Sequence, residues 1–200
     1  MKNKLKIIVL ILTFPGVTAA NNIYFNIGNN HSSVPFKRFS KLIYSNFHPV
    51  YELGKTFDLK EKPNWTWFQT VNVGYFKHRF VQSAIMIYSE NGINKKIVNG
   101  TSANVKLGAG YMHAFTAPEI VQQNAAGDYE IKSDYGRPQI LLSLSFGIEQ
   151  SIIKNVSNGP KISLSYQIRV QTPYVQSYVP LLPYNVLKFG LIFPLHDKKL

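Results

Sequence analysis

The sequence places a histidine next to two serines, in the order His31-Ser32-Ser33. A histidine that takes the proton of a serine hydroxyl activates that oxygen for attack on an ester. This spacing could therefore support acyl transfer or hydrolysis, although the stretch reads equally as an ordinary polar loop. Further groups of the same types are His78, His113, Asp128, Ser133 and Asp134. Their spacing does not single out a triad, so the sequence predicts no catalytic residue.

A second set of charged residues lies on the polar side of runs in which apolar and polar residues alternate: Glu52, Glu90, Lys106, Glu149, Arg169 and Lys188. If these sides face the interior of a closed sheet, the charges need partners there. We expect Lys106 to approach Glu149 and Glu52 to approach Arg169. Such a network could form a polar pathway or gate, or it could hold a sealed lumen together with ion pairs. The sealed lumen is favoured because a narrow barrel leaves little room for water.

Basic residues form a third group, at the end of the molecule where we expect the longer loops: Lys37, Arg38, Lys41, Lys77 and Arg79. Lysine and arginine bind phosphate well, which predicts contact with a phosphate-bearing partner at this end. The other basic residues are spread along the chain, and only 16% of residues are charged despite a net charge of +12. This is not the concentrated basic face of a nucleic-acid-binding protein. The chain has no cysteine, and no metal-ligand spacing or phosphate-binding glycine loop, so we predict no metal and no cofactor.

The elements that must position these groups read as strands. Eight runs with a period of two are separated by turn residues: 23–28, 50–59, 65–77, 81–97, 103–115, 139–150, 161–171 and the last strand, around 187–195. Tight connections at 58–64, 99–100 and 155–160 alternate with longer ones at 29–49, 116–138 and 172–184. An even number of strands with both ends on one side predicts a closed eight-stranded antiparallel up-and-down transmembrane β-barrel.

The direction of the two faces distinguishes a membrane barrel from a water-soluble one. One face of the strands is rich in large apolar residues, as in Leu142, Leu144, Leu164 and Phe189. The other face carries mainly Gly, Ser, Asn and Gln, which suit a narrow lumen better than a water-exposed surface. We therefore expect the apolar face outside, against lipid. Two residues conflict with this arrangement, since Lys55 and Gln69 would also face outward, and a lysine at the bilayer midplane costs about 2–4 kcal/mol. A β-bulge that re-aims Lys55, or an offset of the strand from these bounds, would remove its conflict.

The first 20 residues are typical of a cleaved secretory signal peptide. Lys2, Lys4 and Lys6 precede an apolar run at 7–14, and small residues suitable for cleavage follow at 17–20. That run is too short to span a bilayer, which needs about 20 residues. The remaining 180 residues, 21–200, are then predicted to form one barrel domain.

The end of the last strand, "KFGLIFPL", resembles the C-terminal sorting signal of bacterial outer-membrane barrels. Lys188, Gly190, Phe193 and Leu195 fill its polar, glycine, aromatic and hydrophobic positions, although five more residues follow. The resemblance implies recognition by the barrel-assembly machinery. As a whole, residues 21–200 resemble small bacterial outer-membrane β-barrel proteins of the Bacteroidota type.

This resemblance implies export to the bacterial outer membrane and contact with its lipid and lipopolysaccharide. A non-enzymatic structural or surface-binding role fits best. The alternative is a lipid A-modifying acyl hydrolase or acyltransferase. The lipid A deacylases carry a His-x-Ser motif on the penultimate strand, and that strand has no histidine here. A narrow pore for small apolar molecules is a third possibility. The natural ligand and the oligomeric state stay open.

Overall fold

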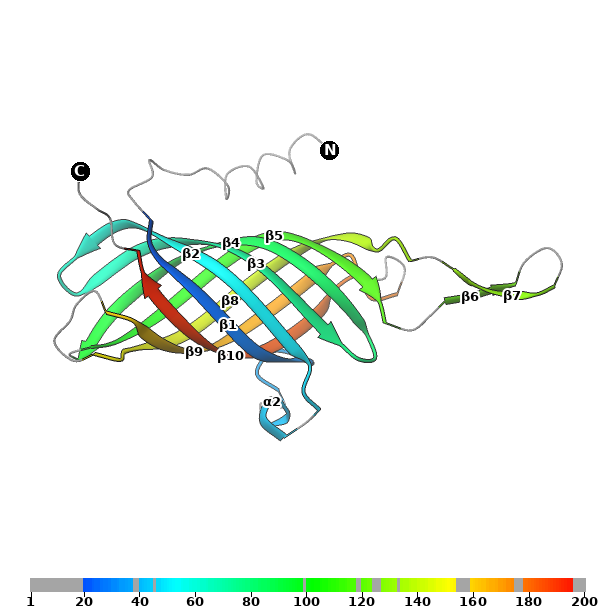
Figure 1. Cartoon of the computed structure of the whole chain (residues 1–200), viewed down its shortest axis with the longest axis horizontal. Helices are drawn as coiled ribbons and strands as arrows, with labels where there is room; N and C mark the ends of the chain where they lie inside the picture. The colour runs from blue at the N-terminus through cyan, green and yellow to red at the C-terminus, as the bar shows by residue number, and fades with distance from the viewer. Residues whose placement is uncertain are drawn as a thin grey trace.

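The computed structural model describes residues 20–37, 40–44, 46–98, 100–117, 120–123, 127–132, 134–153, 159–174 and 178–195. Eight antiparallel strands form a closed barrel in chain order, with β1 paired to the last strand, β10, which confirms the predicted up-and-down fold (Figure 1). The strands are β1 (Ala20–Ser32), β2 (Pro49–Lys62), β3 (Trp65–His78), β4 (Gln82–Val98), β5 (Thr101–Thr116), β8 (Arg137–Ser151), β9 (Lys161–Thr172) and β10 (Leu182–Pro194).

The strands are strongly tilted against the barrel axis. A path that starts at Ser32 and steps from each residue to its paired residue on the next strand passes through β10, β9, β8, β5, β4, β3 and β2. It returns to β1 at Asn22, ten residues from where it started. This stagger of ten residues fixes the tilt and the diameter of an eight-stranded barrel. It also means that directly paired residues on successive strands lie at different depths.

The burial of side chains is inverted relative to a water-soluble barrel. Leu142, Leu164 and Phe189 point outward and are 47%, 54% and 48% exposed, whereas Ser143 is 3% exposed inside the lumen. A mainly apolar exterior of this kind fits hydrocarbon and not water. The expected direction of the two faces is therefore confirmed. Among the described residues, no helix combines the length and apolar character needed to cross a bilayer.

Three elements outside the barrel wall were not expected from the sequence. The short helix α2 (Lys41–Tyr44) follows β1 and lies beside the wall, and β6 (Ile120–Gln123) and β7 (Tyr129–Lys132) form a separate hairpin that extends beyond the rim (Figure 1). All three belong to the longer connections. The start of β1 and the end of β10 lie at the opposite end, with the shorter turns. Of the predicted signal peptide, only Ala20 is described; residues 1–19 lie outside the described part.

The proposed correction of Lys55 by a bulge was wrong. A register shift does interrupt the pairing of β2 with β3, but it lies between Asp58 and Lys60. Lys55 stays in register opposite Val71 and Ile23 and remains exposed on the outer face.

Candidate functional site: a sealed polar lumen and a basic outer rim

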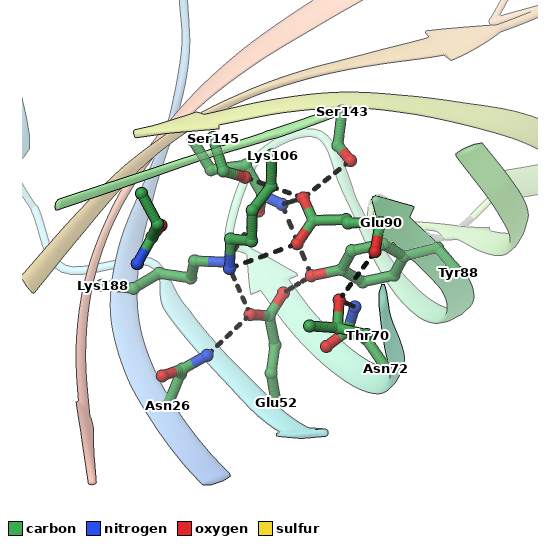
Figure 2. Close-up of polar contacts among 12 residues, drawn as sticks. Asn26, Glu52, Thr70, Asn72, Tyr88, Glu90, Lys106, Ser143, Ser145 and Lys188 are labelled. Atoms are coloured by element: carbon green, nitrogen blue, oxygen red, sulfur yellow. Dashed lines mark hydrogen bonds and ion pairs between the residues drawn. The ribbon is translucent and has the colours of Figure 1, made fainter. Parts of the chain in front are cut away.

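Glu52 of β2 is the centre of a buried ion-pair cluster in the lumen (Figure 2). Its carboxylate forms an ion pair with the Arg169 guanidinium, and it accepts a hydrogen bond from Lys188 Nζ at 2.8 Å. The Tyr88 hydroxyl donates to it at 2.7 Å, and the Asn26 amide lies at 3.4 Å. Four strands other than β2 thus contribute donors, so this one carboxylate links opposite walls of the barrel.

Glu90 of β4 forms a second centre next to the first. Its Oε1 accepts hydrogen bonds from the hydroxyls of Ser143 at 2.9 Å and Ser145 at 2.7 Å, and from Gln167 Nε2 at 2.9 Å. Its other oxygen lies 3.4 Å from Lys106 Nζ. The donors satisfy a carboxylate that would otherwise be buried at high cost.

Gln167 connects the two centres, because its Oε1 accepts hydrogen bonds from Lys188 Nζ at 3.0 Å and from Arg169 Nε at 2.6 Å. The structure thereby brings together five of the six charged residues expected in the lumen: Glu52, Glu90, Lys106, Arg169 and Lys188. Gln167 itself was missed. Its alternation with Arg169 along β9 was the available signal, but the sequence does not show which carboxylates it would reach.

The expected approach of Lys106 to Glu149 was wrong. Lys106 pairs with Glu90, while Glu149 accepts a hydrogen bond from Asn104 at 2.8 Å and lies 3.5 Å from the Asn94 amide. On β5, Lys106 is opposite Ser145, and Glu149 is opposite a residue four positions further along the strand. Four residues of extended chain span about 13 Å, and the Lys106 ammonium turns to Glu90 of the neighbouring strand β4 instead.

An apolar layer fills the lumen on the side of the longer loops. It consists of Val50, Phe76, Ala84, Met86, Met112, Ala114, Leu141, Tyr184 and Val186, packed around the Tyr88 ring. All are at most 2% exposed. On the other side of the ion pairs, a cavity of about 40 Å³ is lined by Tyr24, Lys106 and Glu149, among others, enough for about one or two water molecules. Within the described residues, side chains therefore close the lumen.

Replacing Lys106 with methionine tests this arrangement. The change removes the cation next to Glu90 but leaves the three hydrogen bonds that Glu90 accepts. We therefore expect the free energy of unfolding to fall by about 2 kcal/mol. A buried carboxylate that lost all its donors would cost more. Single-channel current in a planar bilayer should stay at the level of the parent protein, because the apolar layer is unchanged. A clear increase in current would contradict the sealed lumen.

The candidate catalytic residues are scattered over the end with the longer loops. Ser33 Oγ accepts a hydrogen bond from the Asn185 amide at 2.5 Å. Both ring nitrogens of His113 are engaged, one with the Tyr111 hydroxyl at 2.7 Å and one with the Tyr135 carbonyl at 2.9 Å. Asp134 accepts backbone hydrogen bonds, which lower the pKa of its carboxyl. Ser33 and His113 thus bind other groups and not each other, and Ser133 lies outside the described residues.

No cluster of three or more His, Asp or Glu side chains in the described ranges could hold a metal ion.

The loop between β1 and β2 is folded back over the outer wall of the barrel. The amide of Asn185, which points outward from β10, donates to the backbone oxygens of Ser33 at 3.2 Å and Val34 at 3.1 Å. The amide of Asn29, outward on β1, donates to the Leu42 carbonyl at 2.9 Å. These two asparagines interrupt otherwise apolar rows of outward residues, and that interruption was a signal that the sequence analysis overlooked.

A stacked pair of histidines joins this loop to the turn between β3 and β4. The rings of His48 and His78 lie 3.8 Å apart, centroid to centroid. His48 Nδ1 also accepts a hydrogen bond from the backbone N–H of Arg79 at 3.4 Å. Burial lowers the pKa of the His48 imidazole, which favours the neutral ring that can accept this bond. The pair therefore joins the end of the loop to the turn that carries Lys77 and Arg79.

The predicted basic residues are exposed where they are described. Lys37 and Lys41 lie on the folded-back loop, and Lys77 and Arg79 lie at the tip of the neighbouring hairpin. Arg38 lies outside the described residues. The same loop exposes large apolar side chains, of which Phe36 is 68% exposed: Val34, Phe36, Ile43, Tyr44 and Phe47.

The four residues of the suggested sorting signal divide between the two faces of β10. Lys188 and Gly190 face the lumen, where the space that a side chain at Gly190 would need is filled by Asn26. Phe193 and Leu195 point outward and are exposed. The two inward positions thus serve the packing of the folded barrel, and the two outward ones remain accessible.

Comparison with known proteins gives a likeness of fold. No family model and no curated protein sequence matches the chain. Among solved structures, Neisserial surface protein A matches with a TM-score of 0.62 and 9% identity, over 88% of this chain and 98% of that one. The outer membrane enzyme PagL matches with a TM-score of 0.48 and 9% identity, over 87% and 99%. Ail of Yersinia pestis matches with a TM-score of 0.44 and 16% identity, over 88% and 100%.

Proposed function

We propose that the protein is a non-enzymatic barrel of the bacterial outer membrane, exported by its signal peptide, that binds lipopolysaccharide at its basic outer rim. The end with the longer loops faces the outside, and the barrel-assembly machinery inserts the chain through its last strand. The observation that carries this proposal is the folded-back loop between β1 and β2. It exposes Lys37 and Lys41 together with large apolar side chains such as Phe36 and Ile43, next to the apolar outer wall of the barrel.

Lipopolysaccharide is an amphiphile with phosphates next to acyl chains, and the loop offers both kinds of contact. Lysine and arginine form charge-assisted hydrogen bonds to phosphate, and Phe36, Ile43 and Phe47 extend the apolar exterior of the barrel toward the membrane surface. Aromatic side chains are favoured at that depth. The closed lumen supports a role at the surface rather than one in transport.

The basic rim can be tested by replacing Lys37, Lys41, Lys77 and Arg79 together with alanine. We expect several-fold less lipopolysaccharide to copurify with the folded protein, because four phosphate-binding cations are lost while the apolar contacts remain. Lipopolysaccharide bound per barrel would be measured by mass spectrometry after purification in mild detergent. The matched control replaces four lysines at the opposite end: Lys60, Lys62, Lys95 and Lys96.

The control variant should copurify as much lipopolysaccharide as the parent. Equal lipopolysaccharide on the parent and on the outer-rim variant would rule out the basic rim as its binding site. The same cells also address the enzymatic alternative, since an acyl hydrolase or acyltransferase would change the mass of lipid A when the gene is deleted.

A further inference from the structure

The only two tryptophans of the chain, Trp65 and Trp67, lie on the outer wall of β3, at the end of the barrel with the shorter turns. Trp67 is 45% exposed, whereas the next residue, Phe68, lines the lumen cavity. Trp65 points to the same side as Trp67, because side-chain direction alternates along a strand. Both tryptophans therefore face the membrane.

Trp65 lies at the depth of the lipid headgroups. Tyr75, which is also exposed on the outer wall of β3, is ten residues away. Ten residues of strand span about 33 Å. At a tilt of about 40° this length covers about 25 Å across the membrane, which is the height of the apolar band of such barrels. With Tyr75 at one edge of the band, Trp65 is at the other edge, where tryptophan is favoured.

A recess of about 340 Å³ lies beside Trp65 and is lined by Asn64, Trp65, Ile93 and Lys95. Its volume is within the range of small-molecule sites, about 300–1,000 Å³. Trp65 pairs with Lys95 of β4 on one side and with Lys62 of β2 on the other. The Lys62 ammonium lies over the Trp65 ring, 4.9 Å from its centroid. Two lysines therefore flank this ring from the two neighbouring strands.

The barrel does not balance the charge of these two lysines. Among the described residues, neither Lys62 nor Lys95 takes part in an ion pair. Glu61, the acidic residue of the turn between β2 and β3, pairs with Lys96 at 3.9 Å. The recess therefore presents two cations whose counter-charge must come from outside the barrel.

Apolar side chains continue from the recess along the wall toward the centre of the bilayer. Trp67 pairs with Ile93 of β4, and Ile93 pairs with Val105 of β5. Ile93 and Val105 are each 50% exposed. The surface is thus cationic at the membrane boundary and apolar directly below it, which matches a molecule with a negative headgroup and acyl chains.

We propose that the recess binds an anionic phospholipid. Its phosphate lies between Lys62 and Lys95, and its acyl chains follow the wall over Trp67 and Ile93. Lipid already covers this wall, and two unbalanced cations select a negative headgroup from it, because lysine attracts anionic lipids and forms charge-assisted hydrogen bonds to phosphate. A zwitterionic phospholipid would bring an ammonium group that the lysines repel.

The leaflet rests on the orientation proposed above, in which this end lies on the periplasmic side, where phospholipid and not lipopolysaccharide forms the outer membrane. The preference for a negative headgroup does not depend on that orientation. The two lipid sites lie at opposite ends of the barrel and use different lysines, so either proposal can fail without the other.

Tryptophan fluorescence reports directly on the recess, because no tryptophan lies elsewhere in the chain. The folded protein would be placed in phosphatidylcholine bilayers with a small fraction of phosphatidylglycerol that carries brominated acyl chains, which quench tryptophan on contact. We expect several-fold more quenching than with the same fraction of brominated phosphatidylethanolamine. Changing Lys62 and Lys95 together to methionine should remove this preference, whereas changing both to arginine should keep it.

The matched control combines Lys55→Met with Lys161→Met, which removes the same charge elsewhere on the barrel and should keep the preference. Inorganic phosphate should weaken it no more than sodium chloride of equal ionic strength. Heat-modifiable migration on gels would show that each variant is folded. The proposal is overturned if the two brominated lipids quench the parent equally, if the methionine and arginine variants of the recess behave alike, if the control loses the preference, or if inorganic phosphate specifically abolishes it.

Discussion

Replacing Glu52 with glutamine should lower the free energy of unfolding by about 3–5 kcal/mol, the range for breaking a buried ion pair by removing one partner. The substitution keeps the size of the side chain but removes the charge that Arg169 and Lys188 share. Both cations are 1% exposed in the lumen, so water cannot replace the lost carboxylate. Urea unfolding of the barrel in detergent micelles, followed by tryptophan fluorescence and by heat-modifiable migration, would measure the change.

Two variants show whether the loss comes from stranded charge. Glu149→Gln makes the same substitution at a partly exposed carboxylate, which lies beside the amides of Asn104 and Asn94 and has no ion pair among the described residues. Here we expect the free energy of unfolding to fall by only about 1 kcal/mol. Combining Glu52→Gln with Arg169→Met removes one of the two stranded cations and should recover part of the stability. If Glu52→Gln unfolds at the same urea concentration as the parent, the cluster is not what holds the lumen together.

The barrel could be predicted from the sequence because its signal is local. Alternation along each strand decides which side chains face the lumen, as in the contrast between Leu142 and Ser143 on β8 and between Leu164 and Ser165 on β9. The inward charges were found by the same alternation. Of their partners, Arg169 for Glu52 was predicted and is confirmed, whereas the partner of Lys106 was not found, because partners depend on the stagger between strands. Lys106 meets Glu90 on β4 and not Glu149 on β8, a difference of four residues in register.

The loop over the outer wall was missed for a different reason. Asn29 and Asn185 each occupy an outward position, where the pattern predicts contact with lipid, and both bind backbone groups of the loop instead. A polar residue in an apolar row means that something polar covers it.

Replacing Gly110 with alanine should destabilise the barrel by about 3 kcal/mol, at the upper end of the cost of overpacking a core. A side-chain carbon at this position would collide with the backbone oxygen of Ile87 and with Cα and Cβ of Tyr88, directly across the β4–β5 pair. Tyr88 cannot withdraw, because its ring fills the apolar layer and its hydroxyl donates to Glu52 at 2.7 Å. The two strands would have to separate.

Gly147→Ala is the matched control, because it adds the same methyl group to another inward glycine. There the nearest atom would be Asn104 Oδ1 at 2.8 Å, the end of a flexible side chain that can turn aside, so we expect a loss of about 1 kcal/mol or less. Urea unfolding would compare the two variants with the parent. Equal losses would show that the lumen yields as easily around Tyr88 as beside Asn104, and a rigid apolar layer would then no longer explain why the lumen is closed.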